Sequence, residues 1–372
     1  MNPSEQIGVY VHIPFCVRKC AYCDFLSFPA DVKTQEDYVN ALCKQIDATE
    51  EKRPVASVYI GGGTPSAIEP KWIDKILCKL HGDYRIDPDA EITIEVNPGT
   101  LGDSHFAVYK SAGINRLSIG LQSAHDDELH LLGRIHTYSD FLRTFQEARN
   151  AGFENINVDL MTALPGQDAG KLRHSLNCVT DLEPEHISAY SLILEEGTPF
   201  YAQRKDLDLP DEKKERALYY LMRDHLTAHG YTHYEISNFA KDGHESRHNC
   251  SYWTGQDYLG LGLGASSLLS NVRYRNETDL KSYLQDPCAR EAEEVLGEKE
   301  RMEEFMFLGL RMLRGIREQD FEHAFHKPVD SVYGKVIGKL FEQGLIRREN
   351  GRIFLTDSGI DYGNHVFSCF LL

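Results

Sequence analysis

YVHIPFCVRKCAYCDFLSF, residues 10–28, places three cysteines in a short basic loop directly after an apolar run. Cys16, Cys20 and Cys23 are spaced closely, and the basic residues Arg18 and Lys19 lie between the first two. Four thiolates would complete a zinc or iron site, whereas three leave one coordination position open. The rest of the chain must therefore indicate what occupies that position.

The composition describes an ordinary globular protein with an acidic surface. The chain has 372 residues, of which 41% are hydrophobic and 26% charged, enough for one large domain and one or two smaller ones. Its formal net charge is -17. Since nucleic-acid binding depends on phosphate neutralisation by Lys and Arg, we expect no nucleic-acid partner.

The cysteine count and the chain ends indicate a cytoplasmic protein. The N-terminus MNPSEQIG lacks a signal-peptide pattern, and no apolar run approaches membrane-spanning length. Nine cysteines, an odd number, favour reduced thiols over a disulfide framework. The sequence still permits a peripheral contact with a membrane, because such a contact needs no spanning helix.

The first two hundred residues alternate β-branched runs with amphipathic stretches. Strands are predicted at 8–13, 57–61, 91–96, 116–121, 156–161 and 186–193, and helices at about 34–50, 70–81, 101–112, 138–151 and 168–181. This alternation predicts a parallel sheet of βα units, either an open doubly wound sheet or a partly closed barrel. In both architectures the chemistry lies at the C-terminal ends of the strands.

The pattern changes after residue 210. A helix is predicted at 211–230, followed by a stretch rich in His, Tyr and Gly to about 275 and a polar connection at 277–298. Helices at 298–314 and 330–343 precede a hairpin around Asn350 and Gly351, which predicts a winged-helix-like module. Its basic and acidic residues are nearly balanced, so it lacks the basic face of a DNA-binding module.

Polar residues occur at several of the predicted strand ends. Glu95 lies within ITIEV, Gln122 follows RLSIGL and Asp159 lies within INVDLM, with Arg134 between the last two. An unpaired carboxylate in such an apolar run would be costly. The glycines of GGGTPS (61–66) either form a tight turn or let a ligand approach the backbone. Together these residues predict a polar ligand site beside the cysteine loop.

Two metal sites are consistent with the cysteine loop. In a [4Fe–4S] cluster each cysteine binds one iron, and the fourth iron is free to chelate a small molecule. The alternative is a zinc ion whose coordination a distant His or Cys completes. The cluster accounts better for three thiols beside a polar site. Arg18 and Lys19 either offset its negative charge or are solvated loop charges.

The C-x3-C-x2-C pattern after a first strand resembles the signature of radical S-adenosylmethionine enzymes. GGGTPS, EVNPGT, LSIGLQS, LGRIHT and VDLMTALPGQ together resemble the subgroup that contains oxygen-independent coproporphyrinogen III oxidase and the HemW-type heme chaperones. The resemblance covers essentially the whole chain. It implies an α/β fold, a partial (β/α)6 barrel with a C-terminal winged-helix-like α+β module. The core would occupy 1–210, a family-specific extension 211–290 and the module 291–372.

The resemblance also implies a cofactor site. Cys16, Cys20 and Cys23 would hold a [4Fe–4S] cluster whose open iron chelates S-adenosylmethionine. An electron from the cluster would cleave that cofactor to a 5′-deoxyadenosyl radical. The positions that match cofactor contacts in the family are Tyr10, Tyr22, Gly62, Gly63, Thr64, Glu95, Gln122, Arg134 and Asp159.

Two features separate the oxidase from the chaperone. The oxidase pattern has a further cysteine two residues after the third, where this chain has Phe25, and a longer segment before the first strand. Instead, H-N-x-x-Y-W (residues 248–253) matches the motif that HemW-type chaperones use for heme. His248 would be the iron ligand; Cys250 is an alternative ligand, and a hydrogen-bonded structural histidine is the plainer interpretation.

The resemblance thus predicts a heme chaperone that binds heme and S-adenosylmethionine at a [4Fe–4S] core and transfers heme to apoproteins. The alternatives are oxygen-independent coproporphyrinogen III oxidase and a DNA-binding regulator with an iron–sulfur sensor. The resemblance does not say whether S-adenosylmethionine is cleaved catalytically, so the assignment as an enzyme stays open.

Overall fold

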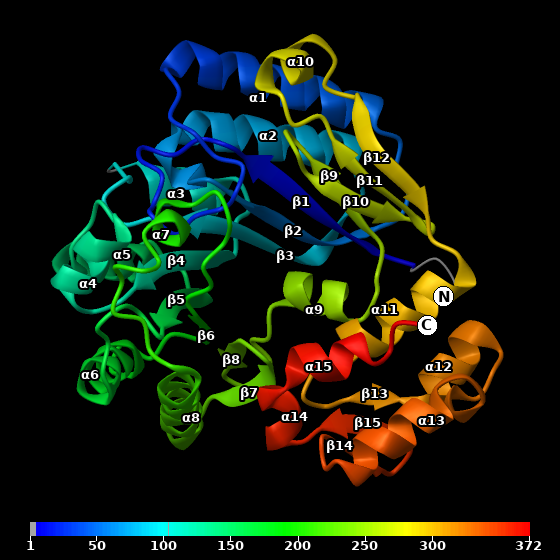
Figure 1. Ribbon diagram of the computed structural model, residues 1–372. Helices are drawn as coiled ribbons and strands as arrows, with labels where there is room; N and C mark the ends of the chain where they lie inside the picture. The colour runs from blue at the N-terminus through cyan, green and yellow to red at the C-terminus, as the bar shows by residue number, and fades with distance from the viewer. Residues whose placement is uncertain (1–4, 103) are drawn as a thin grey trace.

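The computed structural model describes residues 5–102 and 104–372 (Figure 1). Its main sheet has twelve strands in these residues, in the order β12-β11-β10-β9-β1-β2-β3-β4-β5-β6-β8-β7, and its two ends do not pair. The central strands are β1 (Ile7–Ile13), β2 (Val55–Gly62), β3 (Ile86–Val96), β4 (Arg116–Gln122), β5 (Ile156–Thr162) and β6 (His186–Ser191). The helices between them are α1 (Val32–Ala48), η1 (Pro65–Ala67), α2 (Pro70–Asp83), α3 (His105–Ser111), α4 (Asp126–Leu132), α5 (Tyr138–Asn150) and α6 (Ala169–Thr180).

Strands β1 to β6 are adjacent in chain order and parallel, which is the partial (β/α)6 barrel that the resemblance implies. All six predicted strands are present, although the sixth ends at Ser191 instead of 193. The third predicted helix begins at His105 and not at 101. In Figure 1, α1 and α2 cover the sheet beside β1 to β3, and α4 to α6 lie beside β4 to β6.

The strands of the barrel have one apolar and one polar face, because successive side chains point to opposite sides of a sheet. The apolar residues, such as Val9, Ile60 and Ile94, belong to one buried core with helix residues such as Leu77 and Phe141. The opposite face is mostly polar: Tyr10, His12, Ser57, Tyr59, Glu91, Thr93, Glu95, Arg116, Ser118, Gln122, Asn157, Asp159, His186, Ser188 and Tyr190. The barrel interior is therefore lined with polar groups.

Six further strands lie at the two ends of the sheet. They are β7 (Thr232–Glu235), β8 (Asn238–Ala240), β9 (Tyr258–Leu261), β10 (Ser266–Leu269), β11 (Val272–Asn276) and β12 (Arg290–Val295). The accompanying helices are α7 (Pro199–Ala202), α8 (Glu212–Ala228), α9 (Arg247–Trp253) and α10 (Leu280–Gln285). Strand β9 runs parallel to β1, whereas β8 runs antiparallel to β6.

The prediction of a polar connection at 277–298 is wrong. This segment contains α10 and the edge strand β12, which pairs antiparallel with β11. The charged sequence of β12, REAEEV, is mostly exposed. An edge strand needs no apolar face, and charged side chains there discourage pairing with another chain. Hydrophobic periodicity consequently gave no signal for it.

The C-terminal module has a hydrophobic core of its own. It contains α11 (Glu298–Gly309), β13 (Ile316–Arg317), α12 (Glu318–Phe325), α13 (Val329–Glu342), β14 (Ile346–Glu349), β15 (Arg352–Leu355), α14 (Asp357–Asp361) and α15 (Gly363–Ser368). The hairpin β14–β15 turns at Asn350 and Gly351, whose φ angles are 51° and 71°, as a type I′ turn requires. The predicted helix 298–314 ends early, at Gly309.

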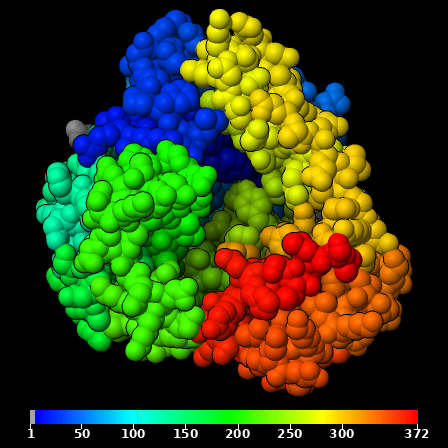
Figure 2. Space-filling view, in the orientation of Figure 1, coloured from blue at the N-terminus to red at the C-terminus, as the bar shows by residue number. Residues whose placement is uncertain are grey.

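The module lies beside the open side of the barrel (Figure 1). Figure 2 shows a hollow at the centre of this face, bordered by the blue and green barrel segments, the yellow extension and the red C-terminal end. Within residues 5–102 and 104–372, no helix has the length and apolar character needed to span a membrane.

Candidate functional site

The cysteine loop follows β1 and is tied to the loop after α4. The Arg18 guanidinium donates hydrogen bonds to the carbonyl oxygens of Gly133 at 2.7 Å and Arg134 at 3.0 Å. Lys19 donates to the Phe25 carbonyl at 2.8 Å. Both basic side chains thus hold the loop backbone in place, a role that neither of the two sequence-based interpretations anticipated.

All nine cysteines are free thiols, and Cys16 is the buried one of the triplet. Burial raises the pKa of the Cys16 and Cys23 thiols. Among the described residues, no three Cys, His, Asp or Glu side chains are placed to hold one metal ion. A cluster makes a different demand, since each thiolate binds a separate iron. Three sulfur donors on one loop, with no disulfide partner, fit that demand.

The glycine stretch (residues 61–66) begins at the end of β2 and lies directly against the cysteine loop. Gly63 and Thr64 donate backbone hydrogen bonds to the carbonyls of Ile13 at 2.8 Å and Phe15 at 2.7 Å. A Cβ atom on Gly63 would lie 2.6 Å from the Phe15 oxygen. Gly62 has a φ of +118°, a backbone conformation that favours glycine. These glycines therefore permit close backbone packing around the loop.

Glu95 connects the glycine stretch to the barrel interior. Its two carboxylate oxygens accept hydrogen bonds from the Tyr59 hydroxyl and the Gly62 amide, each at 3.0 Å. Burial, with a contribution from nearby Asp159, raises the pKa of Glu95 to about 7. Burial also raises the pKa of Asp159, which accepts a 2.7 Å hydrogen bond from Asn157. The interior thus holds two carboxyl groups that partial burial makes easier to protonate.

Arg134 joins the cysteine loop to β3 and β4. One guanidinium nitrogen lies 3.7 Å from the Cys20 sulfur, and the other donates to Asn97 at 2.6 Å and to the Gly120 carbonyl at 2.8 Å. Asn97 in turn donates to the Thr64 hydroxyl at 2.9 Å. A small cavity of about 20 Å³ is lined by Cys20, Thr64, Asn97 and Arg134 among others. This cavity suits a charged ligand, because it has the Arg134 guanidinium beside the Cys20 sulfur and polar groups in its lining.

The remaining predicted contacts lie on the same side of the barrel or pack nearby. Gln122 has a φ of 73° and accepts a hydrogen bond from the Tyr190 hydroxyl at 3.2 Å. The Tyr10 hydroxyl lies 2.9 Å from Nδ1 of His12. Tyr22 packs against a small hydrophobic cluster that includes Leu132 and Met161, the plainer of its two interpretations.

Helix α9, here called the motif helix, lies at the opposite end of the strands. Its backbone amides at Arg247 and His248 donate to the Glu91 carboxylate, both at 3.1 Å. A carboxylate at this position satisfies free amides and complements the helix dipole. The Ser246 side chain caps the same end by accepting from the Asn249 amide. Glu91 thereby docks the motif helix onto the start of the barrel interior.

His248 is buried, with 1% of its surface exposed, and both ring nitrogens have partners. Nδ1 lies 2.9 Å from the Ser57 hydroxyl and Nε2 lies 2.9 Å from the Tyr252 hydroxyl. The ring stacks on Tyr59 at a centroid distance of 5.2 Å. Burial, with the positive charge of Arg116, lowers the pKa of His248 to about 3, so the imidazole is neutral at physiological pH.

The structure therefore separates His248 from the cysteine loop and from the predicted site residues that surround this loop. Gly8, whose added Cβ would lie 3.3 Å from the His248 ring, is near the start of β1, while the cysteine loop follows its end. Five residue steps along β1 correspond to roughly 17 Å. Cys20, Thr64, Glu95 and Arg134 gather at the C-terminal end of the strands, as expected for parallel sheets.

Sequence reasoning missed several polar residues of this interior. They are His12, Tyr59, Glu91, Asn97, Asn157 and Tyr190. A signal was available, because these residues alternate with, or directly follow, the apolar residues that face the helices. A strand whose apolar face packs on helices must present its other face to the barrel interior.

A cysteine loop after β1 of a six-stranded parallel half-barrel, beside a glycine stretch and buried carboxyls, defines a radical S-adenosylmethionine protein. A family model for the radical SAM superfamily matches residues 10–179, and one for the HemN C-terminal domain matches residues 296–362.

The sequence relatives narrow this class. The heme chaperone HemW of Bacillus subtilis is 38% identical over 98% of this chain and 99% of its own length. HemW of Lactococcus lactis is 37% identical over 98% of this chain and 97% of its own length. The protein therefore belongs to the HemW family of the radical SAM superfamily.

A solved structure shares the whole fold. Coproporphyrinogen III oxidase (HemN) from Escherichia coli superimposes with a TM-score of 0.86, covering 100% of this chain and 91% of the oxidase chain. The sequence identity is 23%, so this likeness establishes the architecture and not the activity. Radical SAM membership in turn implies a [4Fe–4S] cluster and S-adenosylmethionine as cofactors.

Proposed function

We propose that this protein is a heme chaperone, which binds heme and transfers it to apoproteins. The observation that carries the proposal is the motif helix, whose H-N-x-x-Y-W sequence docks on Glu91 at the start of the barrel and places His248 beside Ser57 and Tyr252. The full-length similarity to proteins named heme chaperone HemW supports it.

His248 is the iron ligand in this proposal. Its depressed pKa keeps the imidazole neutral, and the neutral imidazole is the form that ligates iron. Because Tyr252 and Ser57 occupy both ring nitrogens, one of these hydrogen bonds must open when iron binds. The Tyr252 side chain belongs to the same helix and is less buried than His248, so rotation of Tyr252 opens Nε2 without moving the barrel strands. Cys250 is a weaker candidate, because burial raises the pKa of its thiol to about 12.

The cofactor site lies at the other end of the barrel in this proposal. Cys16, Cys20 and Cys23 hold the [4Fe–4S] cluster, whose bound S-adenosylmethionine supplies radical chemistry to the family. Arg134 would balance charge beside Cys20, and the Glu95 and Asp159 carboxyl groups would accept hydrogen bonds from polar groups of the ligand. The remaining proposed contacts are Tyr10, Tyr22, Gly62, Gly63, Thr64 and Gln122.

We further propose a cytoplasmic location and no nucleic-acid partner. Every cysteine of the chain is a free thiol, which suits a reducing compartment. The formal net charge of -17 disfavours binding to phosphate backbones. Any membrane contact would be peripheral.

The test is an anaerobic heme titration of the reconstituted protein, followed by absorbance, beside His248→Ala and the control His229→Ala. His229 is an exposed histidine on the end of α8. We expect wild type and control to saturate near one heme per chain, and His248→Ala to lose at least about tenfold in affinity while it keeps iron and sulfide. Heme binding that does not saturate and is the same in wild type and His248→Ala would contradict the proposal. Coproporphyrinogen turnover would then be the next activity to measure.

A further inference from the structure

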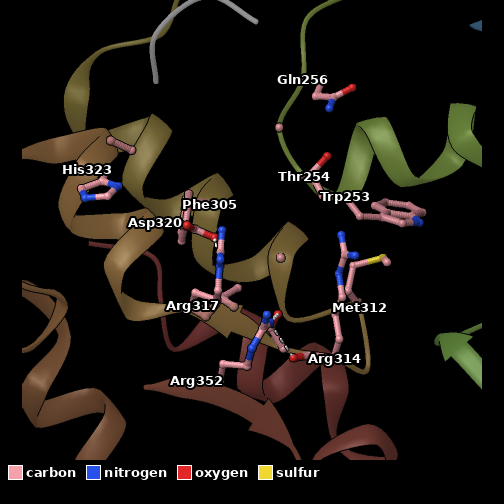
Figure 3. A pocket seen from close by; sticks show the side chains of 15 residues that line it. Trp253, Thr254, Gln256, Phe305, Met312, Arg314, Arg317, Asp320, His323 and Arg352 are labelled. Carbon is pink, nitrogen blue, oxygen red and sulfur yellow. Dashed lines mark hydrogen bonds and ion pairs between the residues drawn. The ribbon is translucent and has the colours of Figure 1, made fainter. Parts of the chain in front are cut away.

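A large cavity separates the motif helix from the C-terminal module. Its volume is about 670 Å³, within the range of small-molecule sites. Trp253, the last residue of the motif helix, and the three residues after it lie on one side, and the C-terminal module supplies the rest from α11, α12, β13, β15 and the loop before β13 (Figure 3). This space is distinct from the small cavity at the cysteine loop, with which it shares no lining residue.

The lining of this cavity is basic, although the protein as a whole is strongly acidic. Arg314, Arg317 and Arg352 line it, against one acidic side chain, Asp320. Arg317 pairs with Asp320 at 2.8 Å, and Arg352 donates to the Arg314 carbonyl at 3.2 Å. Among the described residues, the Arg314 guanidinium has neither a hydrogen bond nor an ion pair. In a protein with a net charge of -17, such a surplus of arginine marks a site for an anion.

The same cavity offers flat apolar surface. Trp253, Phe305 and Met312 contribute an indole, a phenyl ring and a flexible thioether to the lining. The Trp253 ring is itself fixed, because the Arg311 guanidinium lies 4.3 Å from its centroid. Figure 3 shows Trp253 and Met312 on one side of the cavity and His323 on the other, with Arg314 and Arg317 extending between them. Aromatic faces beside arginines suit a flat ring system that bears carboxylates.

We propose that this cavity binds the carboxylate-bearing edge of the tetrapyrrole, with Arg314 and Arg352 as the anion-binding side chains and Trp253 against the ring. The inference rests on the proposed heme-chaperone function and adds a contact outside the barrel. Arg314 is the principal residue, since its charge is unpaired, whereas the charge of Arg317 is offset by Asp320.

The motif helix presents one face to the barrel interior and another to this cavity. His248 and Tyr252 are four residues apart and share the face toward the barrel, while Trp253 is one residue further and lines the cavity. One short helix therefore contacts both the barrel interior and the C-terminal module. The tetrapyrrole carboxylates are held on the module side, and the iron ligand comes from the barrel side once the Tyr252 hydrogen bond opens.

The test compares three probes: heme, iron-free protoporphyrin IX and the dimethyl ester of protoporphyrin IX, which has no free carboxylate. Each is titrated by fluorescence quenching into the full-length protein, Arg314→Ala, Arg314→Glu and the control Arg347→Ala. Arg347 is an exposed arginine of β14 and lies outside the lining. Circular dichroism and a thermal transition establish that each variant is folded.

We expect Arg314→Ala to weaken heme and protoporphyrin IX by about ten- to hundredfold, as lost charge-assisted hydrogen bonds do. Arg314→Glu should weaken both further, and the dimethyl ester should bind all variants alike. Equal affinities of wild type and folded Arg314 variants for protoporphyrin IX would overturn the proposal. The outcomes separate the two claims: loss of heme binding in His248→Ala tests the chaperone function, whereas iron-free protoporphyrin reports the cavity alone.

Discussion

The charge state of Glu95 depends on its surroundings in the barrel interior. The Tyr59 hydroxyl and the Gly62 amide each donate to its carboxylate at 3.0 Å, yet burial and nearby Asp159 raise the pKa of Glu95 to about 7. Two donors are not enough to offset the desolvation of a carboxylate beside a second one. Glu95 therefore titrates near neutrality in the cofactor-free protein, and a bound cation would stabilise its charged form.

The stability of the cofactor-free protein should depend on pH through Glu95. Since the folded-state pKa of Glu95, about 7, exceeds the ordinary value near 4.5, its contribution to stability is complete below the ordinary value and is lost as the pH rises through 7. At 1.36 kcal/mol per pKa unit the loss is at most about 3 kcal/mol. Glu95→Gln should remove this pH dependence.

Denaturant unfolding of the cofactor-free protein at pH 5 and pH 8 measures this pH dependence of the free energy of unfolding. The control Glu154→Gln replaces an exposed glutamate on the surface. We expect wild type and control to lose unfolding free energy between the two pH values by more than Glu95→Gln does. Identical pH dependence in all three proteins would show that Glu95 is ionised with an ordinary pKa.

At the scale of the elements, the glycine stretch packs closely against the cysteine loop. The Gly63 amide bonds to the Ile13 carbonyl at 2.8 Å, and an added Cβ would meet the Phe15 oxygen at 2.6 Å. The Phe15 oxygen is a backbone atom next to Cys16, so relieving the clash must move the cysteine loop. A side chain at this position thus acts on the loop through packing and not through chemistry.

Gly63→Ala should therefore lower the iron and sulfide retained after anaerobic reconstitution and cost about 1–3 kcal/mol of unfolding free energy, as overpacking does. The matched control is Gly82→Ala in α2, where an added Cβ meets no atom within 4 Å. There alanine should raise stability by about 0.5–1 kcal/mol and leave the cluster content unchanged. Full cluster content in Gly63→Ala would mean that the loop tolerates the shift.

At this scale the sequence predicts some elements well and others poorly. The six barrel strands can be predicted from runs of β-branched residues, because each strand places apolar residues against the helices. The strands also lie in the sheet in the same order as in the chain. The hairpin at Asn350 and Gly351 follows from its turn residues. Strand β12 could not be predicted from hydrophobicity, since its stability comes from main-chain pairing with β11.

The candidate site likewise contains residues that can be predicted from the sequence and residues that cannot. Cys16, Cys20 and Cys23 are visible as spacing in the sequence, and the family resemblance adds Glu95 and Arg134. Asn97 directly follows an apolar strand, but its link between Arg134 and Thr64, two residues from different loops, has no signal in the sequence. Hydrogen-bond partners this distant in sequence depend on the closure of the barrel, and no local pattern encodes them.

For the whole molecule, the main feature is the separation of the two proposed sites along the barrel. The cysteine loop lies after the C-terminal end of β1, and His248 lies beside its start, roughly 17 Å away along the strand. Polar and aromatic contacts span this distance. His12 bonds to the Leu26 carbonyl of the loop, Tyr10 bonds to His12 and stacks on Tyr59, and Tyr59 stacks on His248.

This separation predicts nearly independent sites. Cys20→Ala should lose the brown absorbance of the cluster, with its iron and sulfide, because one iron lacks its thiolate. Its heme affinity should stay within about twofold of wild type, since substitutions at distant sites add to within about 0.5 kcal/mol. His248→Ala should lose heme affinity and keep the cluster. The double variant should lose both the cluster and the heme affinity, by the same amounts as the single variants.

A coupling between the sites would appear as a departure from that additivity, measured by heme titration of the two single variants and the double variant. If Cys20→Ala weakens heme binding by tenfold or more while its thermal transition stays cooperative, the two ends of the barrel communicate. The ring contacts from His12 to His248 would then be the connection to test, and Tyr59→Leu, which removes the central ring, should abolish the coupling. If all variants are additive, heme is bound independently of the cluster and the barrel serves as a scaffold between two separate sites.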